Sequence, residues 1–184
     1  MISRKYYLNY LTVFLCAALC AFSVDTNAQT AEEYYDEGMN EYNEINYGQA
    51  LSNFRKAADL GHAPSQAMLG TLLDASEYNE EAREWFQLAA DQGNVEGQLG
   101  LARMLAIGDG GEVDFPGAVK LYTAAAESGS LEAMRILEAN YRNGKLGLKI
   151  DPERADYWLE RAAAGGDRWS QEQLAIRAAP VDAE

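Results

Sequence analysis

Four glycines recur through the chain at nearly constant spacing, and this repeat limits the possible folds more than any other feature. The spacings between them are 32, 36 and 37 residues. An alanine stands 11 residues before each glycine, a larger apolar residue stands 7 before it, and a pair of alanines follows. The glycines are Gly61, Gly93, Gly129 and Gly166, and the first alanines are Ala50, Ala82, Ala118 and Ala155. Periods of this length are typical of repeat proteins, in which each unit packs only against its neighbours.

The positions within each unit predict two helices. Before each glycine, the apolar residues fall at intervals of four, three and one, which place them on one face of an α-helix. Glycine ends this helix because it readily adopts a left-handed backbone. After the glycine, a recurring leucine followed by a small residue indicates the apolar face of the next helix. No segment alternates as a β-strand does. The expected helices span residues 31–44, 47–60, 64–75, 79–92, 95–107, 115–128, 131–143, 152–164 and 168–178.

Polar residues mark the start of several of these helices. Asn46, Asp114 and Asp151 each stand four residues before the repeat alanine. There the side chain can accept a hydrogen bond from an amide of the first turn. In the second unit Tyr78 holds this position, so we expect a tight turn that Ser76 caps instead.

The pattern resembles the Sel1-like repeat family, a relative of the tetratricopeptide repeat. The residues that carry the resemblance are Leu69-Gly70, Leu101-Ala102, the segment 144–148 before Asp151, and the stripe of Ala155, Trp158, Ala162, Ala163 and Gly166. The resemblance implies an all-α, right-handed superhelix of about four helix-turn-helix repeats closed by a C-terminal capping helix. It also implies a role in organising protein complexes.

The first 28 residues have the features of an export signal. Arg4 and Lys5 precede an apolar run over residues 11–22, and a stretch of small and polar residues ends at Ala28. The run is shorter than the roughly 20 residues that a membrane-spanning helix needs. We therefore expect cleavage near Ala28, a repeat domain over 29–180, a flexible tail over 181–184, and a periplasmic or secreted protein without stable membrane insertion.

Composition argues against several classes of function for the exported chain. Its two cysteines, Cys16 and Cys20, lie in the signal, so the repeat domain has no disulfide and no thiol nucleophile. The net charge of −14 disfavours binding to nucleic acid. Residues 29–100 hold 14 acidic and 3 basic residues, which favours a basic partner for this half.

No pattern of residues indicates catalysis, a metal or a cofactor. His62 is the only histidine and follows a turn glycine, where we expect a solvated loop residue. The acids of segment 109–114 lack the alternate spacing of a calcium-binding loop. Trp85 and Trp158 stand at equivalent repeat positions, which favours buried packing over an aromatic cage.

A protein or peptide partner is expected to bind along the first helix of each pair, which lines the inner curve of related helical stacks. Positions three, six and ten residues after a repeat glycine lie off the buried stripe and would face this groove. The candidate groove residues are Thr71, Glu96, Leu99, Arg103, Glu132, Arg135 and Trp169. Their mixed charge suits a peptide or a folded protein.

The favoured function is an exported scaffold or adaptor that holds a protein partner, within an envelope-associated complex. One alternative is a protein that binds or hydrolyses cell-wall fragments or β-lactams, because cysteine-rich members of the family have been linked to such ligands. This chain lacks their disulfide pairs. A regulator of a membrane sensor or a secretion system is the other alternative, since it would use the same surface.

Overall fold

The computed structural model describes residues 29–179, and all regular structure in this range is helical. The helices are α2 (Ala31–Asn43), α3 (Tyr47–Asp59), α4 (Ala63–Ala75), α5 (Asn79–Asp91), α6 (Val95–Ile107), α7 (Phe115–Glu127), α8 (Leu131–Asn143), α9 (Pro152–Ala164) and α10 (Arg168–Ala178). The expected bounds agree with these to within one residue, and the all-α prediction is confirmed. The expected signal (1–28) and tail (181–184) lie outside the described residues.

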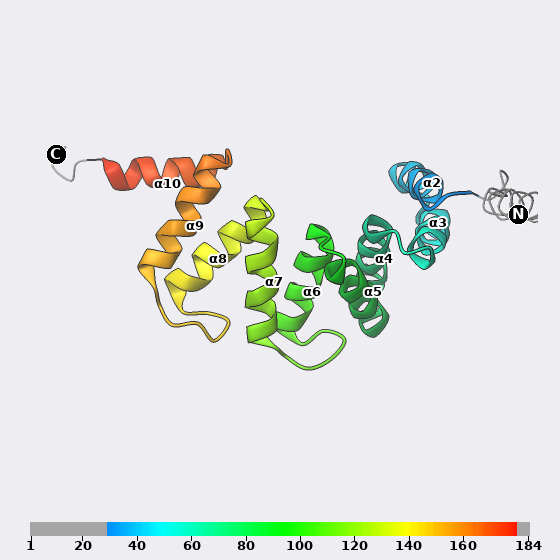
Figure 1. Ribbon diagram of the computed structural model, residues 1–184, viewed down its shortest axis with the longest axis horizontal. Helices are drawn as coiled ribbons and strands as arrows, with labels where there is room; N and C mark the ends of the chain where they lie inside the picture. The colour runs from blue at the N-terminus through cyan, green and yellow to red at the C-terminus, as the bar shows by residue number, and fades with distance from the viewer. Residues whose placement is uncertain (1–28, 180–184) are drawn as a thin grey trace, which may run out of the picture. The chain divides into compact units, whose positions relative to one another are not determined.

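The helices form four antiparallel pairs, α2–α3, α4–α5, α6–α7 and α8–α9, followed by α10. Each helix packs on the next one in the chain, and α4 also contacts α6. Figure 1 shows the pairs following one another in a row, with α10 against α9 at the C-terminal end. The predicted solenoid of four helix pairs and a closing helix is therefore confirmed.

The repeat glycines end the second helix of every pair in the same way. Gly61 has φ +84°; its N–H donates to Ala58 O at 2.9 Å, and the next N–H, of His62, donates to Ala57 O at 3.1 Å. The other three glycines make the same two bonds to their own alanine doublets. The doublets are Ala57-Ala58, Ala89-Ala90, Ala125-Ala126 and Ala162-Ala163. The doublet thus serves both as packing surface and as the acceptor pair that satisfies the helix end.

Small residues let large rings enter the core between helices. The stripe residues Ala50, Ala82, Ala118 and Ala155 are fully buried. Phe86 of α5 is buried between Gly70 of α4 and Gly100 of α6. A Cβ atom would lie 2.9 Å from the ring of Phe86 if added at Gly70 and 2.4 Å from it if added at Gly100. Both distances are shorter than carbon atoms allow when they pack. The absence of a side chain at these glycines therefore sets how closely α4, α5 and α6 approach.

The turns inside the pairs differ in length. The first two are short and place non-glycine residues, Ile45 and Glu77, at φ +66° and +65°. The last two are longer loops in which Gly108 and Gly144 take the left-handed conformation. The tight turn expected between α4 and α5 is confirmed, and the α2–α3 turn is equally tight.

Two of the expected helix caps are confirmed and two are wrong. Asp114 and Asp151 accept hydrogen bonds from first-turn amides of α7 and α9. Asn46 stands at the start of α3 but its amide nitrogen donates to Glu41 Oε2 at 3.0 Å, so its side chain does not cap. Ser76 does not cap α5, because its hydroxyl donates to a carbonyl oxygen of α4. The short turns hold these side chains against the preceding helix.

Two expectations about burial are also corrected. His62 is not a solvated loop residue: its side chain is only 17% exposed, packs edge-on against the Tyr35 ring, and lies 2.8 Å from Ser65 Oγ. Helix α2 covers it, which the position after a glycine did not reveal. Trp158 is buried as expected, at 6% exposed, whereas Trp85 is only half-buried.

Candidate partner-binding face

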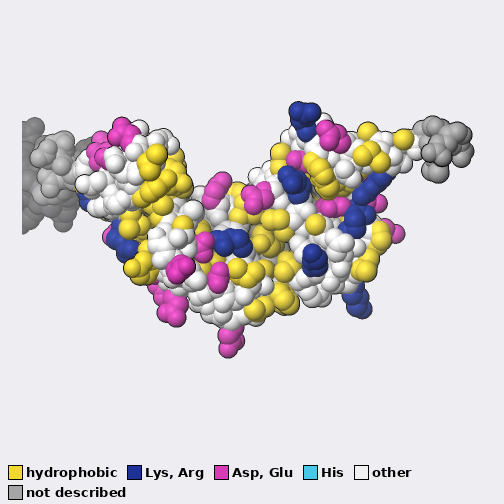
Figure 2. Space-filling model, turned by 180° about the vertical axis from the view of Figure 1, so that it is seen from behind, with side chains coloured by type: hydrophobic (Ala, Val, Ile, Leu, Met, Phe, Trp, Pro, Cys, Tyr) yellow, Lys and Arg dark blue, Asp and Glu magenta, His cyan; other side chains and the backbone are white. Residues whose placement is uncertain are grey.

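The candidate groove residues all lie on the first helices of the pairs and on α10. Thr71 is on α4; Glu96, Leu99 and Arg103 are on α6; Glu132 and Arg135 are on α8; Trp169 is on α10. Leu99 is half-buried, and the other six are exposed. In the space-filling view the row of helices is hollowed between its two ends, and side chains of both charges lie among apolar ones over its middle (Figure 2).

Towards the N-terminal side, two of the candidate groove residues make hydrogen bonds within the chain. Arg103 donates to Asp74 Oδ2 at 2.7 Å and so joins α6 to α4. Thr71 donates its hydroxyl hydrogen to Ala67 O of its own helix at 3.0 Å. Burial raises the pKa of the nearby Tyr122 phenol, and the positive charge of Arg103 offsets part of that rise. Thr71 and Arg103 thus already have hydrogen-bond partners within the chain.

At the C-terminal side, three candidate residues come together. Glu132, Arg135 and Trp169 line a pocket of about 630 Å³ between α8 and α10. Its remaining lining residues are Ile136, Glu138 and Ala139. The Arg135 guanidinium lies 5.6 Å from the centroid of the Trp169 ring and 3.9 Å from Asp167 Oδ1. Trp169 remains 41% exposed, so much of its indole faces solvent.

A network of charges behind this pocket fixes α10 to α8 and α9. The carboxylate of Glu138 is 5% exposed and accepts a hydrogen bond from Arg142, four residues on. Arg142 also donates to Asp156 Oδ1 of α9 at 2.8 Å. Arg177 of α10 donates to the same Asp156 oxygen and lies 3.9 Å from Glu138. The two arginines therefore neutralise the two acids at the junction of three helices.

The network shifts the titration of its members. The hydrogen bond from Arg142, with a second from Arg177, lowers the pKa of Asp156. The same contacts with Asp156 and Glu138 raise the pKa of Arg142. These groups stay charged near neutral pH, because each shift favours the ionised form.

Sequence reasoning missed Glu138 as a structural charge. It follows the repeat leucine at the position that Gly70 and Ala102 hold in earlier units. The signal that could have found it is Arg142, four residues later on the same helix face. The partners on α9 and α10 become visible only once those helices are placed.

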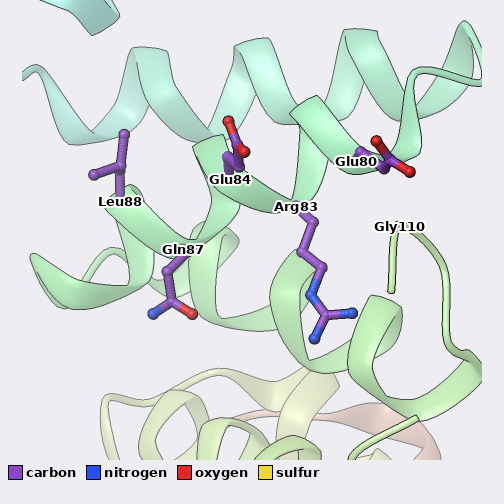
Figure 3. Close-up of a pocket in the computed structure, with 6 residues that line it drawn as sticks. All are labelled: Glu80, Arg83, Glu84, Gln87, Leu88 and Gly110. Atoms are coloured by element: carbon purple, nitrogen blue, oxygen red, sulfur yellow. The ribbon is translucent and has the colours of Figure 1, made fainter. Parts of the chain in front are cut away.

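A second depression, of about 650 Å³, lies on α5 and does not form a chemical site. Five of its six lining residues belong to that one helix, and the sixth is Gly110. Figure 3 shows Arg83 and Gln87 extending to one side of the helix, and Glu84 and Leu88 to the other. Arg83 donates to Glu112 O at 3.3 Å, which ties the 108–114 loop to α5. Its role there is to hold the loop.

Residues 29–179 contain neither a cluster of metal ligands nor a membrane-spanning helix. Within them, no three histidines, cysteines, aspartates or glutamates are grouped as metal ligands would be. None of the helices in this part of the chain is long and apolar enough to cross a bilayer.

Comparison with known proteins identifies the repeat. The family model described as the Sel1 repeat matches residues 28–62, 63–94, 95–130 and 139–167. The chain belongs to the Sel1 repeat family. The second and third matches coincide with the pairs α4–α5 and α6–α7. Sel1 repeat proteins generally mediate protein–protein interaction, and the family is typically a non-catalytic scaffold.

Individual relatives share the repeat over part of their length. The Sel1-repeat-containing protein YjcO of Escherichia coli K12 is 30% identical over 117 residues, which are 60% of this chain and 51% of YjcO. The chain thus spans about half the length of this curated relative. A Sel1 repeat protein from Oxalobacter formigenes is 29% identical, with a TM-score of 0.66 over 72% of this chain and 56% of the other.

A second solved structure is a protective antigen of uropathogenic Escherichia coli strains that displays the Sel1-like repeat fold. It is 30% identical, with a TM-score of 0.69 over 79% of this chain and 33% of the antigen. The sequence match and the structural similarity therefore both assign the chain to the same helical-repeat fold.

Proposed function

We propose that this Sel1 repeat protein is an exported, non-catalytic scaffold that binds a protein partner through the face formed by α4, α6, α8 and α10. The observation that carries the proposal is the exposed Trp169, set beside Arg135 in a pocket of that face. Tryptophan and arginine are enriched among the residues that contribute most to protein interfaces. Exposed and held on packed helices, they lose little freedom when a partner docks.

The rigidity of the support strengthens the proposal. Trp169 follows the cap of α10, where Asp167 accepts hydrogen bonds from both the backbone N–H and the hydroxyl of Ser170. A second anchor of α10 is the Arg177 contact with Asp156 described above. A partner would therefore meet a preformed surface.

Export rests on the sequence of the first 28 residues and places the scaffold in the periplasm or outside the cell. Its partner would then belong to an envelope-associated complex. If export occurs, the mature chain should begin near Gln29. Mass spectrometry of the N-terminal peptide from envelope and secreted fractions checks this; a chain retaining residues 1–28 in every fraction contradicts it.

Site-specific photo-crosslinking in living cells tests the binding face. A photoreactive amino acid with an aromatic side chain, which keeps a ring in place of the Trp169 indole, replaces Trp169 in one strain. In a control strain the same amino acid replaces Leu88, an exposed residue of α5. We expect a discrete crosslinked protein from position 169 and not from position 88. Equal capture from both positions would show that the partner does not use this face.

A further inference from the structure

We infer that the pocket between α8 and α10 binds a cationic side chain of the partner, a lysine or an arginine, with Glu132 as its counter-ion. This inference rests on the proposed function and adds the chemistry that the partner must present. The α8–α10 pocket is defined by the six lining residues given above.

The walls of the α8–α10 pocket suit the aliphatic stem of a long side chain. Ile136, Ala139 and the exposed part of the Trp169 indole supply apolar surface. Ala139 stands ten residues after its repeat glycine, where the preceding unit has Arg103. The short Ala139 side chain therefore leaves space on α8 at the position that the long Arg103 side chain occupies on α6. Lysine and arginine bury such stems against apolar surface while the charged group stays near water.

The charges around the pocket are balanced within the fold except for one. Glu138 is neutralised by Arg142 and Arg177, which also share Asp156. Arg135 lies between the ionised Asp167 and the Trp169 ring. Glu132 alone among the charged lining residues has no hydrogen bond or ion pair to any part of the chain that the structure describes. The unbalanced charge of the pocket is therefore negative.

This balance argues against an acidic or purely apolar ligand. Arg135 is the only positively charged lining residue, and Asp167, whose pKa is lowered chiefly by the Ser170 hydroxyl, already faces it. An uncharged side chain would use the apolar wall and leave the Glu132 carboxylate without a counter-ion. The net charge of −14 further concentrates cationic ligands near the protein.

Three short peptides separate these possibilities: acetyl-Ala-Arg-Ala-amide, its norleucine analogue and its glutamate analogue. Each is titrated into the purified ¹⁵N-labelled chain, and the indole N–H signal of Trp169 is followed by NMR after assignment with Trp169→Phe. We expect the arginine peptide to shift this signal with a millimolar Kd, as one side chain provides only a few kcal/mol. The norleucine peptide should bind at least several-fold more weakly, and the glutamate peptide should bind weakest.

Variants identify the counter-ion. Glu132→Gln should weaken the arginine peptide about three- to tenfold, the effect of losing one partly exposed charged contact. Glu96→Gln is the matched control, because Glu96 stands at the same position of α6, three residues after its repeat glycine. It should leave the affinity unchanged. The inference is overturned if norleucine binds as tightly as arginine, or if Glu132→Gln has no effect.

The photo-crosslinking experiment keeps the two proposals apart. If Glu132→Gln leaves capture from position 169 intact, and arginine and norleucine peptides bind alike, the face binds a partner but not through a cation. If position 169 captures nothing while the arginine peptide still binds in a Glu132-dependent way, the pocket chemistry stands and the scaffold function fails.

Discussion

Glycine inside a helix usually weakens it, yet here two helical glycines allow one phenylalanine to be buried. Gly70 and Gly100 contact Phe86 from the helices on either side, where a Cβ atom has no room. The last pair lacks this arrangement: Leu159 replaces the ring, and Glu138 replaces the small residue. Thus side-chain volume at two positions determines whether a unit closes around an aromatic ring or around a charged group.

Gly100→Ala should destabilise the fold. Its Cβ would meet Phe86 at 2.4–2.5 Å, and such overpacking costs about 1–3 kcal/mol. The better helix propensity of alanine offsets about 1 kcal/mol of this. We expect a net loss of up to about 2 kcal/mol in the free energy of unfolding, measured by urea denaturation.

Gly48→Ala is the control for that measurement. Gly48 is also helical, in α3, but a Cβ added there would have no neighbouring atom within 4 Å. The substitution should stabilise by roughly 0.5–1 kcal/mol. Adding Phe86→Leu should cost less in the Gly100→Ala background than alone, and strict additivity would contradict the contact.

Ile45 offers the opposite kind of substitution. It has φ +66°, a conformation that β-branched residues avoid, and it is 71% exposed, so its side chain contributes little packing. Ile45→Gly should therefore raise stability by about 0.5–1 kcal/mol, even though glycine also gains freedom in the unfolded chain. A thermal melt measures the change. Val113→Gly, in a longer loop and at a residue without positive φ, should not stabilise.

At the scale of elements, α10 differs from the other helices because polar contacts hold it. Ser170 is its only buried residue among those described. Leu174 aligns with the buried Leu69, Leu101 and Leu137. Among the described residues no helix follows α10 to cover it, and it remains half-buried. The Arg177 contacts and the Asp167 cap therefore carry much of the attachment of α10.

Asp156→Asn should loosen α10 selectively. Hydrogen exchange should speed up over residues 168–178 while α4 stays protected. Because the folded pKa of Asp156 is lowered, its contribution is present above its unfolded pKa and fades as pH falls through the folded value. Acidification should therefore reproduce the effect. Glu172→Gln, within an exposed pair on α10, should change little; equal loosening by both variants would rule out the network.

The spacing of small residues was sufficient to predict the helices and part of the site. Alanine and glycine spacing reports local periodicity, so every helix bound could be predicted closely. The same spacing, counted from the repeat glycines, predicted three groove residues that do lie together: Glu132, Arg135 and Trp169. The charge network, the burial of His62 and the failed Asn46 cap could not be predicted, because each depends on a side chain from another helix.

At the scale of the whole molecule, stability comes from contacts between neighbours along the row. The described helices contact chiefly the preceding and following helix, so the buried core is one elongated cluster that follows the row from α3 to α9. Such stacks lose terminal units without losing the rest. Within residues 29–179 there is no cysteine, so helix packing holds the row together without disulfides.

Deleting residues 168–184 should leave a folded protein. Circular dichroism should lose the signal of about one helix, and Tm should fall by only a few degrees, since about 2–4 °C corresponds to 1 kcal/mol at this size. Loss of the cooperative thermal unfolding transition would show that the remaining helices cannot stay folded without α10. The arginine peptide should no longer bind, because Trp169 is removed.

The four glycine-ended joints share one set of backbone bonds, whereas the turns within the pairs range from three residues to longer loops. Connection between units is thus standardised and connection within a unit is not. Gene duplication or engineering can consequently insert a whole unit at a joint, or graft new sequence into a loop, without altering how the next unit attaches.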